Sequence, residues 1–191
     1  MKGLKHYPFN GQKREEVKAK LATQEFDVLI IGGGITGAGI LLDAASRGLS
    51  AALIEKGDYA SGTSSKSTKL IHGGLRYLKN FEFKLVREVG KERAIVYRNA
   101  PHLVVPEKML LPIIKGGTYG KTASNFGLWL YDKLAGVKGK DKRKILSKDE
   151  TLKIEPALKE KDLQASGYYA EYRTDDSRLT LEVIKTALQY K

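Results

Sequence analysis

The chain has 191 residues, a formal net charge of +12 at pH 7 and no cysteine. The lack of cysteine excludes a disulfide framework, a thiolate metal site and a redox-active dithiol within these residues. The excess of positive charge favours anionic partners, which include phosphorylated small molecules, anionic lipid headgroups and nucleic acid.

Residues 1–25 form a basic, mostly polar leader. It lacks the apolar core of a signal peptide, and the sequence contains no uninterrupted run of about 20 apolar residues. We therefore expect a cytoplasmic protein that can lie peripherally on the inner face of the plasma membrane. A short helix is expected over residues 12–24, with Val17 and Leu21 on one face.

Residues 26–37 carry the most informative pattern. An apolar run that predicts a buried strand leads into Gly32, Gly34 and Gly37, which have the spacing of the G-x-G-x-x-G fingerprint. The first glycine allows a sharp turn off the strand, the second opens the main chain to a pyrophosphate, and the third lets the helix pack closely. The helix expected to begin near Ile35 and Thr36 directs its free N–H groups and positive dipole end at the phosphates.

A second apolar strand is expected over residues 51–54, followed by Glu55 and Lys56. The interval from Gly37 to Glu55 is close to the roughly 20 residues expected in a dinucleotide fold. A carboxylate here accepts hydrogen bonds from an adenosine ribose and repels a 2′-phosphate, which disfavours NADP. A lone glycine fingerprint is common by chance. Here the strand before it, the apolar helix after it and the spacing to Glu55 all support dinucleotide binding. The sequence therefore predicts an α/β fold with a dinucleotide-binding βαβ unit.

The loop over residues 57–69 is rich in glycine, serine and threonine. Its hydroxyl and main-chain N–H groups suit phosphate and ring heteroatoms, although a loop of this composition also caps its own backbone without any ligand. Its position directly after the second strand, together with Lys69, His72 and Arg76, favours a ligand-binding role.

Hydrophobic periodicity and breaker residues predict the remaining elements. They are one or two helical turns within 70–78, a helix over 81–98, two short strands flanking Pro106 within 103–114, a helix over 125–135, a strand over 164–171 and a helix from 179 onward. Trp129 and Tyr131 are expected to be core anchors, and Asp175 and Asp176 to cap and charge the start of the last helix. That helix stops without a glycine or asparagine cap, which we interpret as the N-terminal part of a longer protein.

Basic residues are densest between positions 138 and 148. A solvated loop is the plain interpretation of this run, and attraction to an anionic bilayer is the alternative, at roughly 1 kcal/mol per basic group. Aromatic residues are not interleaved with the run, so no nucleic-acid partner is expected. No cluster of His, Asp and Glu has metal-ligand spacing, and no metal is expected.

Two motifs resemble those of the FAD-dependent glycerol-3-phosphate dehydrogenase family. The first covers residues 31–39 with Asp43 and Arg47-Gly48, and the second covers residues 69–78. The resemblance extends through 100–103 and 131–132 to 175–179, and so takes in almost everything after the leader. Leu41 departs from the alanine usual in the first motif, which concerns helix packing and not the phosphate site. The family's later substrate- and flavin-contacting segments are expected beyond residue 191.

The resemblance implies a Rossmann-like FAD-binding domain, the front part of a two-domain FAD-dependent oxidoreductase. Residues 1–25 would be the leader, 26–100 the FAD-binding unit and flavin loop, 101–170 the start of a substrate or cap region, and 171–191 a return to the FAD domain. The implied reaction is oxidation of sn-glycerol 3-phosphate to dihydroxyacetone phosphate by hydride transfer to FAD, with electrons passed to quinone. A glycerophosphate oxidase that uses oxygen and a non-catalytic FAD-binding fragment are the alternatives. A homo-oligomer is expected at full length.

The resemblance also implies roles for the loop residues. Thr63 to Leu70 would lie along the FAD pyrophosphate and ribityl chain, with His72 to Gly74 near the isoalloxazine. Arg76 would face the substrate anion, unless it forms a structural salt bridge, and His72 is a candidate base or flavin neighbour. The full set of expected cofactor-binding residues is Gly32, Gly34, Ile35, Thr36, Gly37, Glu55, Lys56, Thr63, Ser64, Ser67, Lys69, Leu70, Gly73 and Gly74.

Overall fold

The computed structural model describes residues 9, 11–72, 77–78, 80–118, 120–134, 136–137 and 139–190. The chain divides into two compact units, residues 1–69 with 175–191, and residues 70–174. None of the described helices combines the length and apolar character needed to cross a membrane. The functional domain boundaries expected from the sequence at 25/26, 100/101 and 170/171 stay a prediction.

The first unit contains the predicted βαβ motif. Strand β1 (Val28–Ile31) leads into helix α2 (Ile35–Ser46), and strand β2 (Ala51–Ile54) lies parallel to β1. The register pairs Val28 with Ala51 and Ile31 with Ile54. The predicted α/β class and Rossmann-type motif are therefore confirmed.

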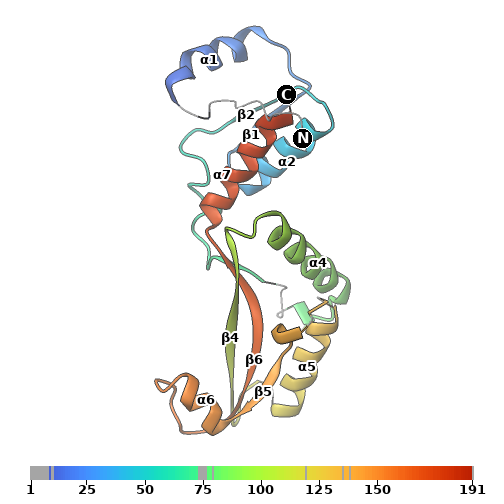
Figure 1. Ribbon diagram of the computed structural model, residues 1–191, viewed down its shortest axis with the longest axis vertical. Coiled ribbons are helices and arrows are strands. Elements are labelled where there is room, and N and C mark those ends of the chain that lie inside the picture. Colours follow the sequence, from blue (N-terminus) through green and yellow to red (C-terminus); the bar gives the residue numbers. More distant parts are fainter. Residues whose placement is uncertain are drawn as a thin grey trace. The chain divides into compact units, whose positions relative to one another are not determined.

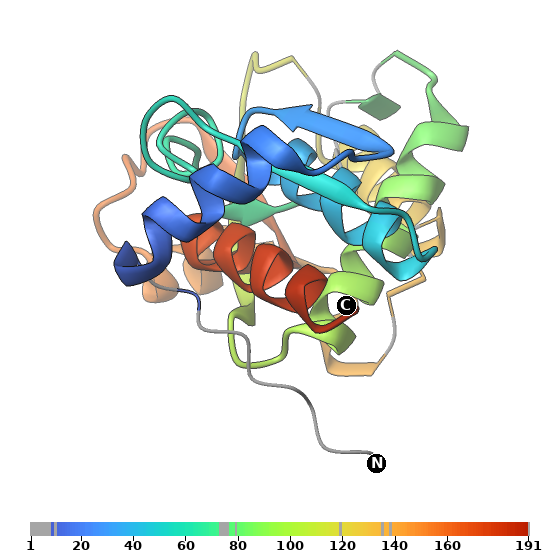
Figure 2. The same cartoon turned by 90° about the horizontal axis from the view of Figure 1, so that it is seen from above.

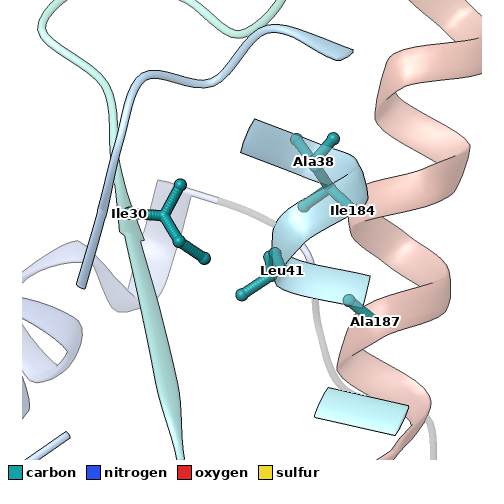
Figure 3. Packing of buried hydrophobic residues seen from close by; sticks show 5 residues of the cluster. All are labelled: Ile30, Ala38, Leu41, Ile184 and Ala187. Carbon is teal, nitrogen blue, oxygen red and sulfur yellow. The ribbon is translucent and has the colours of Figure 1, made fainter. Parts of the chain in front are cut away.

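Helix α7 (Asp176–Ala187), with the short 3-10 helix η3 (Leu188–Tyr190), returns to this unit and runs beside α2 (Figures 1 and 2). Ile30 of β1 points toward Leu41 of α2, and Ile184 and Ala187 of α7 meet the alanine-lined side of α2 at Ala38 (Figure 3). Small residues on α2 allow the two helices to approach closely. This apolar core holds the glycine turn between β1 and α2 in place.

The leader forms the 3-10 helix η1 (Gly11–Lys13) and helix α1 (Arg14–Thr23), as the sequence predicted. Its apolar face is exposed at Val17 and Leu21, and α1 has no buried residue.

The second unit is built on an antiparallel sheet with the long strand β6 (Leu163–Thr174) at its centre. Strand β4 (Val104–Ile114) pairs along one side of β6, from Val104 opposite Thr174 to Ile114 opposite Leu163, with an irregularity at Ile113 and Ile114. Strands β3 (Leu70–Ile71) and β5 (Lys144–Ser147) pair along the other side.

Helices α4 (Phe83–Asn99) and α5 (Lys121–Leu134) cover one face of this sheet (Figure 1). The 3-10 helix η2 (Gly139–Asp141) and helix α6 (Lys148–Ile154) flank β5. Ser147 and Glu150 form a capping box that fixes the start of α6. The helices over 81–98 and 125–135, the strand over 164–171 and the helix from 179 were predicted correctly, although α5 begins earlier and β6 and α7 extend beyond their predicted limits.

Two sequence predictions about the second unit are wrong, and one strand was missed. Residues 70–71 form strand β3, because β6 offers them a partner that local periodicity does not reveal, whereas residues 77–78 are helical, in agreement with the helical turn predicted within 70–78. The two short strands expected around Pro106 are one continuous strand, since among the described residues β4 pairs along one side and a proline can face its other edge. Trp129 is not a core anchor: it is exposed, while Tyr131, which lies on the opposite face of α5, is fully buried.

Candidate functional site

The glycine turn of the first unit has a backbone that requires its glycines. Gly32 has a φ of +117°, a conformation that other residues rarely adopt. A Cβ on Gly37 would collide with the carbonyl oxygen of Gly32, so the third glycine allows α2 to start directly behind the turn. A Cβ on Gly34 would lie only 3.0 Å from the Ser64 hydroxyl, so the second glycine allows Ser64 to approach the main chain.

The start of α2 is held by the loop over residues 57–69, called here the hydroxyl loop. The N–H of Ile35 donates to Ser64 Oγ over 2.8 Å, and the first intrahelical hydrogen bond runs from Ala38 N to Gly34 O over 2.9 Å. The N–H groups of Thr36 and Gly37 precede that first bond and have no partner within the helix. This turn therefore offers two main-chain donors, the positive end of a helix and the Ser64 hydroxyl, a set that fits a pyrophosphate.

Glu55 closes the turn from the end of β2. Its carboxylate accepts the N–H of Gly33 over 2.8 Å and the N–H of Gly57 over 2.9 Å. The hydrogen bonds from Gly33 and then Gly57 lower the pKa of Glu55 below its ordinary value, so it is charged at neutral pH. A carboxylate held by two main-chain donors retains lone pairs for the hydroxyls of a ribose.

The hydroxyl loop is tied to the start of α7. Asp176 accepts hydrogen bonds from Ser67 Oγ and Lys69 Nζ, each over 2.6 Å. Burial opposes ionisation of Asp176, but the bonds from Lys69 and Ser67 outweigh it and lower the pKa. The neighbouring Asp175 caps α7 by accepting the N–H of Arg178, which confirms the predicted cap. The two acids thus have different tasks, since one caps the helix and the other holds the loop.

The other predicted site residues are placed as follows. Lys56 and Thr63 are exposed on the loop of the first unit, and Leu70 lies half-buried in β3 of the second. His72 follows β3 and is exposed. Gly73, Gly74 and Arg76, which were predicted to contact the flavin or the substrate, lie outside the described residues.

Sequence reasoning missed two features of the site. Tyr59 covers Gly33, where any Cβ would meet its ring, and the N–H of Ala60 donates to Gly33 O over 3.0 Å. Asp176 was expected only to place a negative charge in the first turn of α7. Its ion pair with Lys69, which lies 107 positions away in the sequence, was not predicted. No local signal in the sequence points to this pairing, because Lys69 and Asp176 are 107 positions apart.

The second unit holds a buried charged cluster. Arg93 of α4 and Glu171 of β6 are 5% and 3% exposed and form an ion pair over 2.8 Å. Tyr131 of α5 accepts from Arg93 over 3.0 Å and donates to Glu171 over 2.8 Å. The Arg93 guanidinium also lies 4.9 Å from the ring centroid of Tyr172. This cluster joins α4, α5 and β6. Because its polar groups hydrogen-bond to one another, we assign it an architectural role.

Comparison with known proteins agrees with this geometry. The sequence profile of the family described as FAD dependent oxidoreductase matches residues 27–191. The chain is 60% identical over 177 residues to the aerobic glycerol-3-phosphate dehydrogenase of Staphylococcus aureus (strain NCTC 8325 / PS 47), covering 93% of this chain and 32% of that protein. It therefore spans about a third of the length of the curated relatives it matches.

Solved structures show the same fold. The glycerol-3-phosphate dehydrogenase from Bacillus halodurans complexed with FAD is similar with a TM-score of 0.68 and 43% identity, over 93% of this chain and 27% of that one. The L-alpha-glycerophosphate oxidase from Mycoplasma pneumoniae shares the fold at a TM-score of 0.64 and 21% identity, over 88% of this chain and 44% of that one. From the matched profile, we conclude that the chain belongs to the family of FAD-dependent oxidoreductases, in which FAD is the cofactor.

Proposed function

We propose that this chain is the FAD-binding front part of an enzyme that oxidises sn-glycerol 3-phosphate to dihydroxyacetone phosphate and passes the electrons to quinone. The observation that carries the proposal is the 60% identity to an aerobic glycerol-3-phosphate dehydrogenase over 93% of this chain. The geometry of the glycine turn supports its cofactor part, because the turn offers the donors that a pyrophosphate needs.

Each part of the proposed site has a chemical task. The pyrophosphate would be bound by the main-chain N–H groups of Thr36 and Gly37 and by the hydroxyl of Ser64. The carboxylate of Glu55 would accept hydrogen bonds from the ribose hydroxyls. Lys69, fixed by Asp176, orders the loop along the cofactor. When bound, FAD supplies the acceptor for the hydride that leaves C2 of glycerol 3-phosphate as the hydroxyl proton moves to a base.

Two further residues would serve the substrate. Arg76 would bind the phosphate dianion or the oxyanion developing at C2, because a guanidinium makes paired, charge-assisted hydrogen bonds. His72 is the candidate base, or a neighbour of the flavin, since an imidazole nitrogen can accept a proton from a hydroxyl. In the complete protein, Arg76→Ala would impair turnover while FAD stays bound.

We further propose that the protein is cytoplasmic, forms a homo-oligomer at full length and contacts the inner face of the plasma membrane, where its quinone acceptor is dissolved. Electron transfer to oxygen is the second candidate, favoured by the shared fold of the Mycoplasma pneumoniae oxidase. Oxygen uptake with formation of peroxide during turnover would favour that candidate over quinone.

The first test is the visible spectrum of the protein in its natural length, before and after anaerobic addition of glycerol 3-phosphate. Flavin bands at about 370 and 450 nm that bleach on addition would support both cofactor and substrate. Bands that stay unchanged would remove the substrate from the proposal, and a lack of bands after addition of FAD would remove the cofactor site.

Gly34→Val tests the turn itself. The branched side chain would press on Ser64 and displace the hydroxyl that accepts the N–H of Ile35 at the start of α2, so FAD retention should be lost. Gly39→Val is the matched control, because Gly39 lies on the exposed side of α2 with no atom within 4 Å of an added Cβ. Equal flavin content in both variants would refute the assignment of the phosphate turn.

A further inference from the structure

The middle glycine of the turn, Gly33, stands at a position where the dinucleotide fingerprint itself requires no glycine. Unlike Gly32, it does not have a positive φ, so its backbone conformation is open to other residues. An added Cβ, however, would overlap the ring of Tyr59 and lie 3.1 Å from Cβ of Glu55. Gly33 is therefore a glycine because side chains, above all Tyr59, pack directly on its main chain.

Three groups from the end of β2 and the following loop hold Gly33. The Glu55 carboxylate accepts its N–H over 2.8 Å, and the N–H of Ala60 donates to its carbonyl oxygen over 3.0 Å. The Tyr59 ring packs against the side where a Cβ would be. A run of three glycines is a very flexible backbone segment, so contacts from outside the run have to fix its orientation. These three groups supply such contacts.

The segment that supplies two of these groups is itself strained. Ala60 is buried and has a φ of +59°, a left-handed conformation that residues other than glycine rarely adopt. In this conformation the Tyr59 ring and the Ala60 N–H both reach Gly33. Strained residues persist where the surrounding structure holds them firmly, and they gather at ligand-binding segments. The strain at Ala60 is therefore consistent with a functional demand on this contact.

The leader reaches this contact through Phe9. The ring of Phe9 stacks on that of Tyr59, with 6.0 Å between the ring centroids and 29° between the ring planes. Tyr59 is half-buried and contacts both Phe9 and Gly33, whereas Phe9 is 41% exposed. Stacked aromatic rings stabilise one another beyond the burial of their apolar surface. The leader therefore supports the ring that packs on the glycine turn.

We propose that Tyr59 is a positioning residue for FAD and that Phe9 of the leader acts through it. With the Tyr59 ring against Gly33, the turn keeps the main-chain donors of Thr36 and Gly37 in the orientation that a pyrophosphate requires before the cofactor binds. Preorganised donors bind more tightly than mobile ones, because less conformational entropy is lost on binding. The inference rests on the cofactor part of the proposed function and does not depend on the substrate or the electron acceptor.

The test is the dissociation constant of FAD, measured by flavin titration of the natural-length protein after removal of its cofactor. The unfolding midpoint of the same apoprotein is measured alongside by circular dichroism. Tyr59→Ala should raise the dissociation constant at least about tenfold. Tyr59→Phe should stay within about twofold of the wild type, because phenylalanine keeps the ring that contacts Gly33 and Phe9.

The part played by the leader is tested at Phe9. Phe9→Ser should raise the FAD dissociation constant about fivefold, because the stack on Tyr59 is lost. Leu21→Ser is the matched control, since Leu21 is an apolar residue of the leader with a similar exposure, and it should stay within about twofold of the wild type.

A double-mutant cycle distinguishes positioning from general damage to the fold. Gly33→Ala should raise the FAD dissociation constant at least about tenfold in the wild type, because the added Cβ overlaps the Tyr59 ring. In the Tyr59→Ala background it should cost less than about threefold, which is the remaining effect of the Glu55 Cβ. Phe9→Ser should likewise lose its effect in that background. Independent structural roles would give additive losses instead.

Three results would overturn this inference. They are equal FAD affinity of Tyr59→Ala and the wild type, additive effects in the cycle, and a loss of FAD affinity that only follows the loss of folded apoprotein. An effect of Phe9→Ser no larger than that of Leu21→Ser would remove the leader from the proposal. A wild type without flavin bands would instead reject the cofactor site itself, so failure of the proposed function is distinguishable from failure of this inference.

Discussion

Glu55 shows how one side chain serves both the backbone and the expected cofactor. The main-chain N–H groups of Gly33 and Gly57 reach its two carboxylate oxygens from opposite sides of the turn. The glycine fingerprint therefore depends on an acid that is distant in sequence. We infer that the charge at this position orders the turn before any ribose binds.

Glu55→Gln should weaken FAD binding and destabilise the first unit, because the amide turns a donor toward one of these N–H groups. The pKa of Glu55 is lowered below its ordinary value of 4.5, so its stabilising contribution is complete above that pH and is lost as the pH falls through the folded-state pKa. Chemical unfolding between pH 3 and 7 should therefore show a difference between wild type and Glu55→Gln that narrows below about pH 4.5.

Glu15→Gln on the exposed helix α1 is the control and should follow the wild type across this range. A difference between wild type and Glu55→Gln that stayed constant down to pH 3 would contradict the role given to the Glu55 charge.

At the scale of elements, α7 and the hydroxyl loop form one structural piece. Asp176 in the first turn of α7 binds both Ser67 and Lys69 of the loop. The start of the helix is secured independently by Asp175. The loop can therefore be released without loss of the helix cap.

Asp176→Asn should lower FAD affinity several-fold and speed tryptic cleavage after Lys66, since the amide cannot match the charge-assisted bond from Lys69. Asp175→Asn is the matched control, because asparagine is as good a helix cap as aspartate. Flavin titration and limited proteolysis check the two effects. Equal behaviour of the two variants would mean that the loop does not depend on Asp176.

The elements of the second unit are joined by the buried pair of Arg93 and Glu171. Arg93→Met should reduce the free energy of unfolding by about 3–5 kcal/mol, because it leaves the buried carboxylate of Glu171 without its counter-ion. Arg173→Met is the control, because it breaks the exposed ion pair with Glu107 in the same sheet. This variant should change the free energy of unfolding by less than about 1 kcal/mol. Urea unfolding compares the two, and similar losses would refute the architectural role of the buried pair.

At the scale of the whole molecule, the sequence predicted the elements whose signals are local. The β1–turn–α2–β2 motif follows from glycine sterics, an apolar run and one spaced acid, all within about 30 residues. Helices α4 and α5 followed from periodicity. The sequence analysis missed strand β3 and the continuity of β4, because both strands depend on hydrogen bonds to β6.

By itself, the sequence determined that a dinucleotide turn forms, which glycines it needs and that an acid follows β2, since short-range sterics and spacing decide these features. Only the tertiary structure decided that Asp176 holds the hydroxyl loop, that Arg93, Glu171 and Tyr131 form one buried cluster, and that Trp129 faces outward. These features depend on contacts between residues 38 to 107 positions apart, or on which face of a helix meets a sheet. A periodic pattern reveals an apolar face, but only packing determines which partner covers it.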